Sequence, residues 1–107
     1  MEERLGGFEE LVLLAVAALR SAGYGVSIQQ QLEEETGHAI SLGAVYTTLD
    51  RLERKGLVAS KLGAPTAERG GKPKRLYRVT AAGSTALVDA RRIRQKLWSA
   101  IESPARP

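Results

Sequence analysis

Residues 41–80 read SLGAVYTTLDRLERKGLVASKLGAPTAERGGKPKRLYRVT, and this segment says most about the architecture. Ser41 is a good N-cap for a helix. After it, apolar residues recur at the spacing of a helix with one buried face, at Leu42, Val45, Leu49 and Leu52. Gly56 ends this helix at its C′ position. Two strands are expected over 57–61 and 75–79, joined by a basic loop rich in glycine and proline. This order of elements predicts a winged helix-turn-helix, an α+β and mostly helical fold.

Two more helices are predicted before this segment. Residues 8–21 have apolar side chains at helical spacing, and a glycine-containing turn separates them from a second helix over 26–35. Gly37 fits the left-handed position that ends the second helix. The side chains of the second helix that we expect to face inward are Val26, Ile28 and Leu32.

A fourth helix follows the second strand, and Thr80 can cap it. We therefore expect three parts in the chain. Residues 1–80 form the winged-helix domain, with three helices and a β-hairpin wing. Residues 81–102 form one C-terminal helix that mediates dimerisation, and residues 103–107 are a flexible tail.

Composition excludes several classes of protein. At 107 residues the chain fits one domain, and without cysteine it has neither disulfides nor a thiolate metal site. No apolar run approaches a membrane span and no signal peptide is visible, so we expect a cytoplasmic protein with no membrane partner. His38 is the only histidine, and Gly70-Gly71-Lys72 lacks the spacing of a phosphate-binding loop. We expect no enzyme activity, no cofactor and no metal.

Charge is divided unevenly along the chain. Residues 1–40 carry two basic and seven acidic side chains, whereas residues 41–107 carry 14 basic and five acidic ones. Such a division favours a basic face that meets a polyanion. A basic half that is simply a solvated surface is the other interpretation.

Three segments in this order resemble the PadR family of bacterial transcriptional regulators. LLAVAALRSAGYGVSIQQQLEEETG (13–37) resembles the family's first two helices, and LGAVYTTLDRLERKGLV (42–58) its recognition helix and the start of the wing. ERGGKPKRLYRVTAAGSTAL (68–87) resembles the end of the wing. Ser21-Ala22-Gly23 stands where many members have Pro-x-His-Gly. The resemblance covers about residues 8–88 and implies a short member with a single helix after the wing.

The recognition helix of such a protein enters the major groove by its N-terminal half, where the side chains here are small. Thr47 can hydrogen-bond a base or touch a thymine methyl group, while Tyr46 and Arg51 suit phosphate. A Tyr46 half-buried against the first helix is the other interpretation. The predicted DNA contacts on this helix are Ser41, Gly43, Ala44, Tyr46, Thr47 and Arg51.

The wing is predicted to grip the DNA backbone or enter the minor groove. It is dense in basic residues, and its glycines allow a close approach. A solvated loop without a DNA contact is the other interpretation, and either Arg75 or Arg78 can belong to a structural ion pair instead. The predicted contacts in the wing are Arg69, Gly70, Gly71, Lys72, Lys74 and Arg75.

The fourth helix has an apolar stripe that so small a domain cannot easily cover. Packing against a second copy of the chain is expected, and the helix folding back on its own core is the other solution. Trp98 either anchors this interface or, as the resemblance implies for some members, stacks on a small aromatic effector. The residues predicted at the interface are Leu11, Ala86, Ala90, Ile93, Leu97, Trp98 and Ile101.

Together these features predict a regulator that binds a palindromic operator in double-stranded DNA as a homodimer. We expect a repressor, with release by a small effector as a further possibility. The rival interpretation is a winged-helix protein-interaction module whose basic wing binds an acidic partner.

Overall fold

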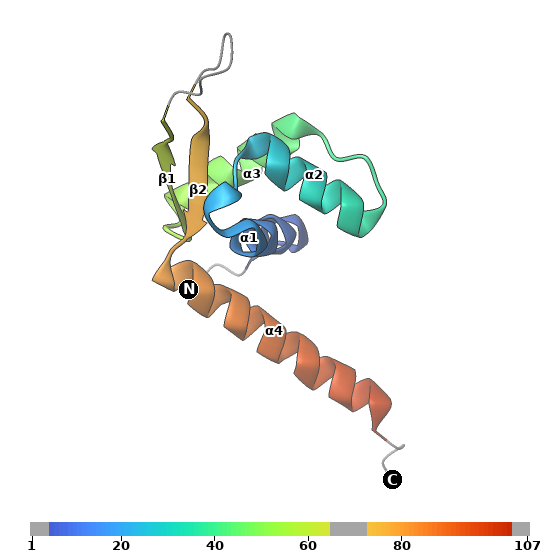
Figure 1. Ribbon diagram of the computed structural model, residues 1–107. Helices are drawn as coiled ribbons and strands as arrows, with labels where there is room; N and C mark the ends of the chain where they lie inside the picture. The colour runs from blue at the N-terminus through green and yellow to red at the C-terminus, as the bar shows by residue number, and fades with distance from the viewer. Residues whose placement is uncertain (1–4, 65–72, 104–107) are drawn as a thin grey trace.

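The computed structural model describes residues 5–64 and 73–103 (Figure 1). The elements in chain order are α1 (Gly7–Leu19), a single 3-10 turn η1 (Arg20–Ala22), α2 (Gly25–Thr36), α3 (Leu42–Arg54), β1 (Val58–Leu62), β2 (Arg75–Val79) and α4 (Ala81–Glu102). Helices α1, α2 and α3 pack together, and the two strands lie beside them as a hairpin. The predicted fold, three helices with a wing and a further helix, is confirmed.

The ends of the helices follow the predicted local signals. Ser41 Oγ accepts a hydrogen bond from the Ala44 amide at 3.1 Å and so caps α3. Gly37 and Gly56 have φ values of 72° and 76°, the left-handed conformation that glycine adopts without strain. Thr80 Oγ1 accepts from the Gly83 amide at 3.1 Å and donates to the Gly56 carbonyl at 2.7 Å. Thr80 therefore caps α4 and ties it to the end of α3.

The wing is an antiparallel pair in which Val58 lies opposite Val79 and Leu62 opposite Arg75. The first strand thus begins one residue later than predicted. The Tyr77 amide donates to the Gly23 carbonyl at 2.8 Å, which fixes the hairpin to the turn between α1 and α2. The predicted wing contacts Arg69, Gly70, Gly71 and Lys72 lie outside the described residues.

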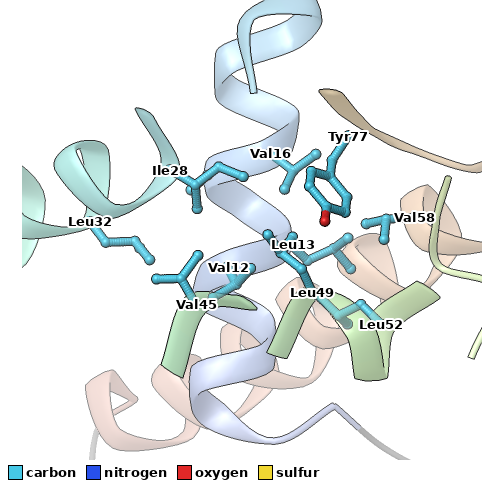
Figure 2. Close-up of a cluster of buried hydrophobic side chains, with 11 residues drawn as sticks. Val12, Leu13, Val16, Ile28, Leu32, Val45, Leu49, Leu52, Val58 and Tyr77 are labelled. Carbon is cyan, nitrogen blue, oxygen red and sulfur yellow. The ribbon is translucent and has the colours of Figure 1, made fainter. Parts of the chain in front are cut away.

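The core is a single cluster drawn from α1, α2, α3 and both strands (Figure 2). The ring of Tyr77 points from β2 into this cluster, and burial raises the pKa of its hydroxyl. The prediction that Val26 faces inward is wrong, because its side chain is 37% exposed. Val26 and Ile28 are two positions apart, about 200° around a helix, so they cannot share one face. The side chains with no more than 2% exposure are Val12, Leu13, Val16, Ile28, Val45, Leu49, Leu52 and Val58.

Helix α4 starts against the body, directly after the end of β2, and then extends away from it (Figure 1). A Cβ at Gly83 would overlap the Leu57 carbonyl, so only glycine permits this close start. Residues 91–103 are all exposed. The Arg94 guanidinium binds the Glu10 carboxylate of α1, with Nη2 2.8 Å from Oε1 and Nε 3.0 Å from Oε2. None of the helices in the described residues is long and apolar enough to cross a membrane.

Candidate nucleic-acid interface

The rotation of α3 is set by the side chains that it buries. Val45 and Leu49 are fully buried, and Thr48 is 5% exposed. At about 100° per residue, Gly43 and Thr47 then lie on the opposite face, and both are exposed. Small side chains therefore occupy the solvent face of the N-terminal half of the helix. This is the half that the sequence predicts to read bases.

Two side chains of α2 fix the point at which α3 begins. Gln29 Nε2 donates to the Ile40 carbonyl at 2.8 Å, and Glu33 Oε2 accepts from the Ile40 amide at 2.8 Å. Ile40 directly precedes the N-cap Ser41. Both backbone groups of the residue before the cap are thus held by α2, and the start of α3 is rigidly placed relative to that helix.

Tyr46 lies on the flank of α3 that faces the beginning of α2. Its side chain packs on Gly25, the first residue of α2. Tyr46 remains 46% exposed. Among residues 5–64 and 73–103, no group forms a hydrogen bond with its hydroxyl. A half-exposed ring with a hydroxyl of this kind is suited to a phosphate contact.

Arg51 lies on the other flank of α3, next to the ion pair between Glu9 and Lys55. Burial alone would raise the pKa of Glu9, but the Gly6 amide, Lys55 and then Arg51 outweigh it, so the pKa is lowered. Arg51 is exposed and lies on the side of α3 that faces Glu9 of α1. The predicted phosphate contacts Tyr46 and Arg51 therefore lie on opposite sides of the recognition helix.

Two basic residues at the base of the wing are held by neighbours. Lys74 Nζ lies 4.1 Å above the ring centroid of Tyr24, the N-cap residue of α2. Arg75 Nη1 donates to Ser60 Oγ at 3.1 Å, and Ser60 Oγ in turn donates to Glu53 Oε2 at 2.8 Å. Arg75 is thus linked to α3 through Ser60, without a direct ion pair.

The start of α2 is where α3 and the wing meet. Tyr46 of α3 lies against Gly25, and Lys74 of the wing lies over Tyr24, the preceding residue. Sequence reasoning missed Gly25, Glu53 and Ser60, because their roles depend on partners far away in the chain. The only local signal was Gly25 itself, a glycine at the first position of α2. This signal is weak, because most residues are equally acceptable at the first position of a helix.

The predicted interface residues of α1 and α4 are accessible. Leu11 of α1 is 41% exposed, and Leu97, Trp98 and Ile101 of α4 are 61–72% exposed. Ile93 is 38% exposed, and Ala86 and Ala90 are partly covered by the body of the domain. The C-terminal half of α4 does not fold back on its own core. Its apolar side chains are left without cover within the described part of the chain.

The described residues include no group of three or more His, Cys, Asp or Glu side chains that could hold a metal ion. The site is built from hydroxyl, ammonium and guanidinium groups around a helix with small side chains. Such a set is suited to an anionic polymer surface.

Comparison with known proteins agrees with this geometry. Residues 13–89 match the model of the transcriptional regulator PadR-like family. The chain is 36% identical over 74 residues to the transcriptional regulator Rv3488 of Mycobacterium tuberculosis, a match that spans 69% of this chain and 64% of that relative.

Two solved structures are similar over most of their length. A putative transcriptional regulator, TA0346, from Thermoplasma acidophilum has a TM-score of 0.65 at 25% identity, with 94% of this chain and 95% of that chain covered. A PadR family transcriptional regulator from Eggerthella lenta has a TM-score of 0.69 at 28% identity, with 85% and 77% covered. The family model covers well over half of the sequence, and the chain belongs to the PadR-like family of transcriptional regulators.

Proposed function

We propose that the protein is a DNA-binding transcriptional regulator, a repressor that inserts the N-terminal half of α3 into the major groove. The observation that carries this proposal is the convergence at the start of α2. The small solvent face around Gly43 and Thr47 leaves room for base edges, and Tyr46 and Lys74 stand beside it where phosphates would pass.

The predicted contacts divide between the two kinds of recognition. On α3, base contact is assigned to Thr47 and to the small residues Ser41, Gly43 and Ala44, and phosphate contact to Tyr46 and Arg51. In the wing, Lys74 and Arg75 contact the backbone together with the basic loop that precedes them. Since Arg75 is already oriented by Ser60, it needs little ordering on binding.

The regulator acts as a homodimer on a palindromic operator. The exposed apolar side chains of α4, with Leu11 of α1, form a surface that a second copy can cover. A two-fold pair places two copies of α3 on successive turns of one DNA face, about 34 Å apart. A small aromatic effector that stacks on Trp98 would alter the packing of the paired α4 helices. It would thereby shift the dimer away from the spacing that the operator requires.

The test is fluorescence-anisotropy binding to duplex DNA from upstream of the protein's own gene, across a salt series. Specific binding that weakens with salt is expected, and Lys74→Ala should reduce the slope of log affinity against log salt by about 0.9 if it loses one phosphate contact. Arg92→Ala, on exposed α4, is the control and should keep the wild-type slope. Absence of binding at low salt would favour the protein-interaction module instead.

A further inference from the structure

We propose that Gly25 is a positioning residue for DNA binding, because the space where its side chain would be is taken by the ring of Tyr46. This inference rests on the proposed function and deepens it. Gly25 places the hydroxyl of Tyr46 at the first turn of α2, one residue after the tyrosine whose ring Lys74 covers, so that both groups reach the same stretch of DNA backbone.

The contact is made by the free end of the Tyr46 ring. A Cβ built on Gly25 would lie 2.7 Å from Cε1 of Tyr46 and would overlap Cζ and the hydroxyl oxygen still more. The three nearest heavy atoms found around that Cβ all belong to the Tyr46 side chain. Any residue other than glycine therefore forces the hydroxyl away from α2.

Backbone conformation does not explain the glycine. In the described residues, the glycines with positive φ are Gly37 and Gly56, so Gly25 has a conformation that alanine adopts freely. Alanine is also the better helix former. The nearest obstacle to a side chain at position 25 is the Tyr46 side chain.

Gly83 is a purely structural glycine and differs from Gly25 in what a side chain would meet. A Cβ there would meet the backbone carbonyl of Leu57, which cannot move without shifting the domain. At Gly25 the obstacle is the end of a side chain that is 46% exposed and can swing into solvent. Gly25→Ala should therefore leave the fold intact and displace only the tyrosine.

Lys74 supports the same placement from the wing. Its ammonium lies 4.1 Å above the ring of Tyr24, which precedes Gly25. Two groups suited to phosphate contact, the neutral hydroxyl of Tyr46 and the cationic ammonium of Lys74, thus lie against adjacent residues of the chain. Displacing Tyr46 would break up this pair without removing any residue that touches DNA.

The experiment is a double-mutant cycle with Gly25→Ala, Tyr46→Ala and both changes together, measured as affinity for operator duplex and as thermal unfolding midpoint. Gly7→Ala is the matched control, since Gly7 is the first residue of α1 and a Cβ there meets nothing within 4 Å. We expect Gly25→Ala to bind about tenfold more weakly, the loss of a hydrogen bond to a charged group, at an unfolding midpoint no lower than wild type. In the Tyr46→Ala background, Gly25→Ala should change the affinity by less than about twofold.

Ring signals of Tyr46 in NMR spectra of the free protein give a second measurement. They should move in Gly25→Ala and stay in place in Gly7→Ala. Wild-type affinity in Gly25→Ala, or a full further loss when the two changes are combined, would overturn the positioning role. So would a Gly25→Ala chain that unfolds while the double variant folds, since the ring would then be immovable. If wild type itself does not bind duplex DNA, the proposed function fails and takes this inference with it.

Discussion

The ammonium of Lys55 lies 3.0 Å from both carboxylate oxygens of Glu9, so the residue that ends α3 is held by the first turn of α1. Glu9 is 6% exposed, and its Oε1 also accepts from the Gly6 amide at 2.8 Å. One buried carboxylate therefore caps α1 and anchors the far end of the recognition helix.

Glu9→Gln should destabilise the domain by about 1–3 kcal/mol, less than a fully buried pair because the Lys55 side chain is 22% exposed. The change removes the negative charge that interacts with both Lys55 and Arg51. Urea unfolding followed by circular dichroism measures the loss. Glu34→Gln, on the exposed face of α2, should stay within about 0.5 kcal/mol of wild type, and an equal loss there would contradict the assignment.

Acid should remove the contribution of the Glu9 carboxylate. Its pKa in the folded protein is below the ordinary value of 4.5, so the stabilisation is fully present above pH 4.5 and is lost as the pH falls through the folded pKa. The difference in unfolding free energy between wild type and Glu9→Gln should be constant near neutrality and shrink below pH 4.5. A difference that grows on acidification would refute this sign.

Glu33→Ala should lower both stability and DNA affinity. Removal of the carboxylate leaves the Ile40 amide without its acceptor, which costs about 1 kcal/mol, and the start of α3 loses one of its two attachments to α2. Unfolding and anisotropy titrations measure the two effects. Glu35→Ala is the matched control, because Glu35 is an exposed acid of the same helix and its loss changes the net charge equally.

Gly83→Ala should destabilise the protein by roughly 1–3 kcal/mol, the range for a group forced into a packed site. The added Cβ would meet the Leu57 carbonyl and Cγ1 of Val79, where β2 passes into α4. Differential scanning calorimetry should show a lower midpoint for this variant and an unchanged or higher one for Gly7→Ala. Equal midpoints for both variants would show that α4 does not start as close to the body as described.

Leu97→Glu should convert the proposed homodimer to a monomer. Leu97 is 63% exposed in one chain and would be buried in the pair, where an unpaired carboxylate is unfavourable. Analytical ultracentrifugation gives the mass, and Lys96→Glu serves as a charge-changing control on the neighbouring face. A wild-type sample that is monomeric at all concentrations would rule out this interface.

Local signals in the sequence predicted the ends of the elements well, since a cap needs only its own turn. The predicted caps are found at Ser41 and Thr80, each of which accepts a hydrogen bond from an amide three residues later. The predicted helix ends are found at Gly37 and Gly56, where the signal is the positive φ of a single residue. The winged-helix architecture followed from the order of these elements, and the family from the resemblance of three segments to its members.

The details of the site depended on packing that no local pattern contains. Thr48 of α3 is buried beside Val45 and Leu49, and a buried threonine is not distinguishable from an exposed one by sequence. The contacts of Tyr46 with Gly25 and of Arg75 with Ser60 join residues 21 and 15 positions apart. Which individual wing and recognition-helix residues touch DNA stays a prediction.

Thr80 is the single residue between the last position of the wing and the first position of α4. A helix of 22 residues is about 33 Å long, so a change of about 5° at this joint moves its far end by roughly 3 Å. In a dimer joined through α4, the same small angle would move the two copies of α3 apart or together by a comparable distance, which is close to the rise of one base pair. In the proposed dimer, the hydrogen bonds of Thr80 with Gly56 and Gly83 would limit this angle, together with the Arg94–Glu10 contact, and so restrict the operator spacings that the pair can bind.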